Sequence, residues 1–213
     1  MCLGGKLSLT SHDVSSLVMD TLCDQLKGQN TAVACFYFDF TAQKEQTPTS
    51  ILGALLKQVI GGLNEIPEKI VQAFRDQRNV AGSRGPGLSE IREMLKGVSS
   101  AQRTFLCIDA LDECVSECRL KVLDSLKYIL QRSPTTRIFL TGRQHTRRTV
   151  EKHLSGKITT VPITPTEGDI IRFLRLRLSE DTTPEAMDSS LEADILKSIP
   201  ETVSEVYVRA ADN

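Results

Sequence analysis

The most constraining feature of this sequence is an apolar run that ends in three acidic residues. Residues 103–114 read Arg-Thr-Phe-Leu-Cys-Ile-Asp-Ala-Leu-Asp-Glu-Cys, which places Asp109, Asp112 and Glu113 directly after the apolar stretch. A continuous run of this kind predicts a strand covered on both faces of a parallel sheet. Open α/β sheets bind ligands at the carboxyl ends of such strands, where a carboxylate can hold Mg²⁺ directly or through water. We therefore predict that Asp109 is a metal ligand, and that Asp112 and Glu113 orient a water molecule for phosphoryl transfer.

The same acids also have a structural interpretation. Asp and Glu favour the first turn of a helix, so an N-capping aspartate followed by ordinary first-turn acids gives the same pattern. The length of the apolar run and the spacing of the acids favour the nucleotide site, but the sequence leaves both interpretations open.

Length and composition set the broad class of the protein. A chain of 213 residues fits one domain, or one domain with a small appendage. Its 26 basic and 27 acidic residues give a net charge of −1, which selects neither nucleic acid nor a membrane as the partner. No run approaches the roughly 18 apolar residues of a membrane-spanning helix, and the first residues have no apolar signal core. We expect a cytoplasmic protein that binds no membrane.

The six cysteines are scattered and predict reduced, structural thiols. Cys114 and Cys118 have the i, i+4 spacing of half a metal site. No Cys-x-x-Cys pair or nearby histidine completes that site, which argues against zinc.

Hydrophobic periodicity predicts an α/β fold with a mostly parallel sheet and flanking helices. Four strands are expected at residues 31–40, 104–109, 137–141 and 158–163. Amphipathic stripes predict helices within 14–26, 52–63, 67–78, 88–98 and 122–130. Residues 1–163 form the expected core domain, and residues 164–213 the expected start of a truncated helical subdomain.

In this order, the elements resemble the NACHT-type domain of STAND-class P-loop NTPases, specifically the nephrocystin-like domain of fungal signalling proteins. The resemblance rests on five segments, which are Ser15–Asp20, Phe36–Phe40, Phe105–Cys114, Ile138–Arg143 and Gly168–Phe173. It implies that residues 105–114 are the Walker B motif and that Mg-ATP or Mg-GTP is the cofactor. It also implies that Arg143 extends toward the γ-phosphate, that the chain forms homo-oligomers and that signalling domains are its partners.

The phosphate loop of the family, Gly-x-x-x-x-Gly-Lys-Ser/Thr, has no intact counterpart here. Alignment of residues 14–20 with the family keeps its first glycine as Gly5, and we expect Gly5 to contact phosphate. The second glycine becomes Thr10, the lysine becomes Ser11 and the Mg²⁺-binding hydroxyl residue becomes His12. Loss of the lysine removes a charge-assisted contact of roughly 1.5–3 kcal/mol. The resemblance therefore implies a degenerate nucleotide-binding switch domain that does not hydrolyse nucleotide at the family's rate.

A strand is also expected to be absent. In the family, an apolar strand precedes the phosphate loop and runs through the middle of the sheet, whereas only Met-Cys-Leu precedes Gly4 here. We expect the central N-terminal strand to be largely missing, in a chain truncated at both ends. Such a gap would leave the edges of two buried strands unpaired.

Two other functions remain open. One is a catalytically inactive scaffold or interaction module that binds no nucleotide. The other is a nucleic-acid-binding module, suggested by basic residues at positions 143, 145, 147, 148, 172, 175 and 177. Because no aromatic stacking platform or recognised module accompanies these residues, nucleic acid is the less favoured partner.

Overall fold

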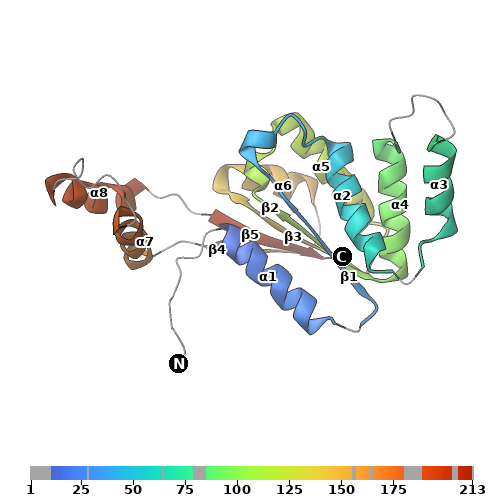
Figure 1. The fold of residues 1–213 in the computed structure, drawn as a ribbon, viewed down its shortest axis with the longest axis horizontal. Helices are drawn as coiled ribbons and strands as arrows, with labels where there is room; N and C mark the ends of the chain where they lie inside the picture. Colours follow the sequence, from blue (N-terminus) through green and yellow to red (C-terminus); the bar gives the residue numbers. More distant parts are fainter. Residues whose placement is uncertain are drawn as a thin grey trace.

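The computed structural model contains a five-stranded sheet with helices on both faces (Figure 1). The structure describes residues 11–27, 29–63, 65–78, 85–154, 157–163, 166–179, 189–202 and 206–212. In chain order the main elements are α1 (Ser11–Gln25), β1 (Thr31–Tyr37), α2 (Pro48–Gly61), α3 (Glu68–Arg78), α4 (Leu88–Ala101), β2 (Arg103–Asp109), α5 (Ser116–Leu130), β3 (Thr136–Arg143), α6 (Arg147–His153), β4 (Lys157–Ile163), α7 (Glu167–Ser179), α8 (Ser189–Thr202) and β5 (Val206–Asp212). Short 3₁₀ turns, η1 (Phe40–Ala42), η2 (Leu111–Glu113) and η3 (Gln144–Thr146), follow β1, β2 and β3.

The strands β1, β2 and β3 form the parallel part of the sheet. Ala34 pairs with Leu106, and Leu106 in turn pairs with Ile138, so the three apolar runs lie side by side. Helices connect these strands because parallel neighbours need a crossover connection. The predicted α/β class and parallel sheet are confirmed.

The middle of the sheet differs from our expectation. The strand order is β1-β2-β3-β5-β4, and β5 runs antiparallel to both β3 and β4. Residues 206–212 therefore belong to the sheet, and their assignment to a helical subdomain is wrong. The expected unpaired edges do not occur, because β5 pairs with both β3 and β4. Residues 1–10, to which the expectation of a missing N-terminal strand refers, lie outside the described residues.

Helices cover the two faces of the sheet unequally. The helix α1 lies along one face, while α2, α4 and α5 pack together on the other (Figure 1). The main core fills the second interface with fully buried side chains such as Leu55, Leu95, Leu106, Leu126 and Ile138. Each side chain of this size contributes about 1.5–3 kcal/mol when it is fully buried.

Local sequence signals explain where the elements begin and end. Thr47 caps α2 by accepting a hydrogen bond from the Ser50 amide, and Pro48 occupies the first turn, where its missing N–H costs nothing. β1 ends at Tyr37, before the predicted end at Phe40. Its end is earlier because Asp39 accepts a hydrogen bond from the Thr41 amide and caps the η1 turn.

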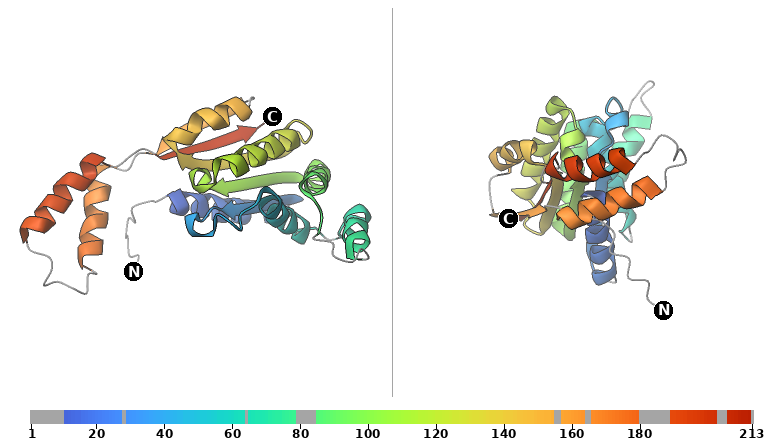
Figure 2. Two further views of the ribbon diagram at one scale, coloured as in Figure 1. Left: turned by 90° about the horizontal axis from the view of Figure 1, so that it is seen from above. Right: turned by 90° about the vertical axis from the view of Figure 1, so that its left-hand side faces the viewer.

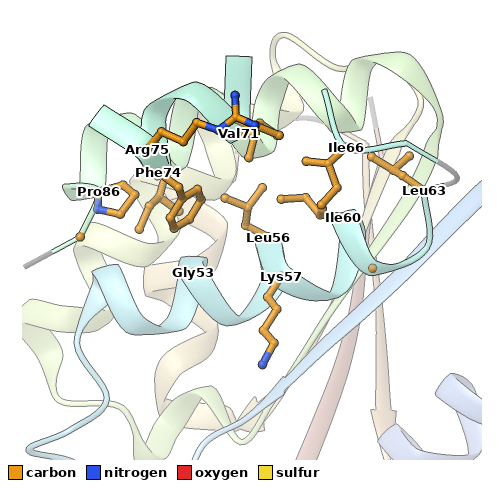
Figure 3. A pocket seen from close by; sticks show the side chains of 14 residues that line it. Gly53, Leu56, Lys57, Ile60, Leu63, Ile66, Val71, Phe74, Arg75 and Pro86 are labelled. Atoms are coloured by element: carbon orange, nitrogen blue, oxygen red, sulfur yellow. The ribbon is translucent and has the colours of Figure 1, made fainter. Parts of the chain in front are cut away.

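The helices α7 and α8 form a hairpin that projects away from the sheet (Figure 2). Phe173, Leu176 and Leu191 of this hairpin have exposed side chains. At the other end of the molecule, α3 stands off from α2 and α4 (Figure 1) and leaves an apolar groove of about 1190 Å³. Phe74 and Ile66 line the α3 side of the groove, and Leu56 and Ile60 line the α2 side (Figure 3).

Among the described residues, no helix combines the length and the apolar character needed to cross a membrane.

The described cysteines are free thiols in different environments. Cys23 is exposed, whereas Cys107, Cys114 and Cys118 are buried. Burial raises the pKa of Cys107 to about 12. A raised pKa lowers the fraction of reactive thiolate at any given pH.

We therefore expect iodoacetamide at pH 8 to modify Cys23 well before Cys107. The measurement is peptide mass spectrometry of the native protein over time, with a urea-unfolded sample as the control in which both thiols react. Equal rates for Cys23 and Cys107 in the native protein would contradict the placement of Cys107 in the sheet.

Candidate functional site

The candidate site begins at the carboxyl end of β2, where Asp109 is buried with 2% of its surface exposed. The hydroxyl of Thr141 donates a hydrogen bond to the Asp109 carboxylate. The same hydroxyl oxygen accepts a hydrogen bond from the Ala110 amide at 3.0 Å. Thr141 belongs to β3, so this one side chain ties the ends of two neighbouring strands together around a buried acid.

A strained turn follows Asp109. Ala110 has φ 53° and ψ 45°, a left-handed conformation that costs a residue with a Cβ roughly 1–2 kcal/mol. This conformation turns the chain from β2 into η2, where the Glu113 amide donates to the Ala110 carbonyl at 2.9 Å. Leu111 is fully buried and anchors the turn in the core. Strain of this kind persists where the surrounding structure holds it, and such positions cluster at functional sites.

The turn brings Asp112 to the end of β3. Asp112 Oδ1 accepts a hydrogen bond from the Arg143 amide at 3.1 Å, and Asp112 Oδ2 lies 3.3 Å from Arg143 Nε. The side chain of Asp112 is 10% exposed, and that of Arg143 is 66% exposed. The acid is thus fixed in the protein, while the arginine extends from it into solvent.

Gly142 lies beside Asp112 and Thr146. A Cβ built at position 142 would lie 3.1 Å from Thr146 Oγ1 and 3.5 Å from Asp112 Oδ1. The first distance is tighter than ordinary van der Waals contact, so a larger residue would press on the Thr146 hydroxyl, whereas the second is an ordinary contact. The Thr146 hydroxyl donates to the Arg143 carbonyl, so a side chain at position 142 would disturb the turn after β3.

Glu113 is directed to a different element. Its Oε2 atom accepts a hydrogen bond from the Phe40 amide at 3.0 Å, and its carbonyl accepts one from Gln43 Nε2 at 2.7 Å. Both contacts hold the segment that follows β1. Glu113 therefore connects η2 to the segment that contains η1. Its role in orienting water stays a prediction.

The predicted site residues fall into three groups. Asp109, Asp112 and Arg143 lie at the carboxyl edge of β2 and β3, and Asp112 contacts Arg143 there. Glu113 lies beside them but contacts η1. Gly5 lies outside the described residues.

Sequence reasoning missed Thr141. The signal was present, since the apolar runs of β2 and β3 both end in polar residues, and Ile108 pairs with Leu140 in the register. Asp109 follows Ile108 and Thr141 follows Leu140, so an alignment of the ends of the two apolar runs would have placed Asp109 beside Thr141.

The oxygen donors fit a metal ion that a ligand helps to hold. Mg²⁺ is typically bound through one or two carboxylates, with waters and substrate phosphates completing its shell. Asp109 and the hydroxyl of Thr141 supply oxygen donors of this kind. The described residues contain no group of three or more His, Cys, Asp or Glu side chains that could hold a metal alone. Asp109 and Thr141 are therefore residues that could hold Mg²⁺ together with water and phosphate oxygens.

The chain matches the model of a known family. The family model for the N-terminal region of nephrocystin 3 matches residues 15–143, from within α1 to the last residue of β3. This chain belongs to the nephrocystin-3 N-terminal family. The match covers Asp109, Asp112, Glu113 and Arg143, and it confirms the resemblance to the nephrocystin-like domain.

A solved structure is also similar to this chain, that of the Aeropyrum pernix Orc1 protein in complex with DNA. The sequence identity is 16% and the TM-score 0.47, over 92% of this chain and 52% of the Orc1 chain. This chain thus spans about half the length of the Orc1 protein. No curated protein matches this chain at a significant level.

Proposed function

We propose that this domain binds a magnesium nucleotide, ATP or GTP, at the carboxyl edge of β2 and β3, as a cytoplasmic signalling switch of the NACHT and STAND type. The observation that carries the proposal is the buried Asp109 carboxylate held by Thr141 at the end of a central parallel strand. Ligands of open α/β sheets bind at this edge, and a fixed carboxylate there is suited to Mg²⁺.

Arg143 supplies the positive charge for the proposed site. It follows Thr141 by two positions, and its side chain is largely exposed at the end of β3. An arginine in this position can make charge-assisted hydrogen bonds to phosphate oxygens. In the absence of the usual lysine, Arg143 is the cation that we assign to the terminal phosphate.

Binding without rapid hydrolysis is the state that we propose. Ser11 stands where the family has its phosphate-loop lysine, so transition-state charge at the terminal phosphate lacks one of its usual partners. Glu113 contacts the Phe40 amide, which leaves it poorly suited to orient a water molecule. Nucleotide then acts as a ligand that favours one conformation, and coupling to homo-oligomerisation or to signalling domains follows from the family resemblance.

A scaffold without nucleotide is the second candidate. It is favoured by the contacts of the two acids after Asp109, since Asp112 is paired with Arg143 and Glu113 with the Phe40 amide. In that case these acids hold the turn and the two neighbouring loops in place, and they have no role in chemistry.

A thermal-shift titration separates the two candidates. At Mg-ATP or Mg-GTP concentrations about ten times the dissociation constant, we expect the melting temperature to rise by about 3–6 °C. The Asp109→Asn protein should show a much smaller rise relative to its own ligand-free melting temperature, because the neutral amide binds Mg²⁺ poorly. Asp76→Asn, a change on the exposed surface of α3, is the matched control and should respond like the wild type.

Two results would contradict the proposed function. No shift at millimolar nucleotide, with a cooperative unfolding transition, would favour the scaffold. Rapid phosphate release by the wild type that is lost in Asp109→Asn would contradict the proposed absence of turnover.

A further inference from the structure

We infer that Asp112 is a positioning residue that clamps Arg143 and competes with phosphate for its guanidinium. This inference rests on the proposed function for the phosphate, but the clamp itself is a property of the protein without ligand. It replaces the prediction that Asp112 orients water with a role that its contacts support.

Both oxygens of the Asp112 carboxylate face the same residue. Oδ1 accepts from the backbone amide of Arg143, and Oδ2 lies 3.3 Å from its Nε atom. A water-orienting base needs an oxygen directed at the reacting water. Here the carboxylate instead holds the backbone and the side chain of one arginine.

The two partners differ in their freedom to move. Asp112 is fixed by the η2 turn, with the buried Leu111 before it and the amide of Glu113 bonded to the Ala110 carbonyl after it. The backbone of Arg143 is held by Asp112 and by the Thr146 hydroxyl, which donates to its carbonyl at 2.9 Å. The side chain of Arg143 is 66% exposed. It is therefore the part of this cluster that is free to leave its partner.

Phosphate and Asp112 offer the guanidinium the same kind of contact. Each is an anion that accepts charge-assisted hydrogen bonds from arginine. The negative charge of Asp112 also opposes the approach of a phosphate to this edge. Removal of that charge should strengthen anion binding, whereas removal of a metal ligand or a catalytic acid should weaken the binding or turnover of a magnesium nucleotide.

The clamp is tested without nucleotide by NMR on the ¹⁵N-labelled protein. We expect Asp112→Asn to shift the Nε–H resonance of Arg143 strongly, because the charged acceptor is lost. Glu151→Gln is the matched control, since it removes the neighbouring exposed pair of Arg147 and Glu151 at 3.0 Å and should move Arg147 without moving Arg143. An Arg143 Nε–H resonance that is the same in wild type and Asp112→Asn would overturn the clamp.

A second variant tests the contact between Asp112 and the backbone if Asp112→Asn folds poorly. Arg143→Gln keeps the backbone amide at position 143 and removes the guanidinium. Hydrogen exchange at the amide of residue 143 should stay slow in this variant, because Asp112 Oδ1 still accepts its hydrogen bond. Fast exchange at this amide would overturn the contact between Asp112 and the backbone.

The competition is tested with ATP in the presence of EDTA, so that no metal ion contributes. We expect Asp112→Asn to bind this ATP about two- to fivefold more tightly than wild type, the range of a partly exposed ion pair. Arg143→Gln should bind more weakly than wild type. Unchanged or weaker binding by Asp112→Asn would overturn the competition. Absence of binding with and without Mg²⁺ would overturn the proposed function, and the Arg143 resonances would then decide the clamp alone.

Discussion

Replacing Val208 with proline is expected to lower the free energy of unfolding by about 3 kcal/mol or more. Val208 lies in the middle of β5, where it pairs with Thr141 of β3 and with Val161 of β4. Proline has no N–H to donate to a neighbouring strand, and its ring fits poorly inside a central strand. The measurement is urea unfolding followed by circular dichroism.

The cost of proline should depend on its position in the sheet. Val206 is the first residue of β5, where proline is better tolerated, so Val206→Pro is the matched control with a smaller expected loss. The native Pro162 lies in β4, which is an edge strand of this sheet. Equal stability of Val208→Pro and wild type would show that β5 is not part of the sheet in solution.

Replacing Thr141 with valine is expected to cost about 2–4 kcal/mol of stability, because a buried carboxylate and a buried amide both lose a partner. Valine has nearly the shape of threonine but no hydroxyl. The Asp109 carboxylate would lose the hydrogen bond that Thr141 donates, and the Ala110 amide would lose its acceptor. The same change should weaken any stabilisation by Mg-nucleotide, since Asp109 is no longer held in place.

Serine at position 141 is the control for this prediction. Thr141→Ser keeps the hydroxyl and removes one methyl group, which should cost about 0.8 kcal/mol. The two variants are compared by urea unfolding and by thermal shift with Mg-ATP. A loss in Thr141→Val no larger than that in Thr141→Ser would show that the hydroxyl contributes little to the site.

Much of the fold was predictable because its signals are local. The four apolar runs predicted β1 to β4, and each strand begins within one residue of the expected position. The helical stripes likewise predicted α2 and α5, whose apolar positions form the core with β2 and β3. Because parallel strands end at the same edge, the meeting of Asp109 with Arg143's segment was also predictable.

The rest depended on contacts between distant parts of the chain. The sequence of β5 contains apolar residues, but nothing local shows that it inserts between β3 and β4. The direction of Glu113 was equally hidden, because it depends on the Phe40 amide across the sheet edge. The Asp112–Arg143 pair depends on the left-handed turn at Ala110, a conformation that alanine rarely adopts.

The central place of β5 also affects how the domain forms during synthesis on the ribosome. Strands β3 and β4 emerge before β5, which lies beyond α7 and α8 in the chain. Until β5 is made, the facing edges of β3 and β4 have no partner, and open edges of this kind readily pair with other chains. The strand that completes the sheet therefore also determines when the newly made domain is protected from aggregation.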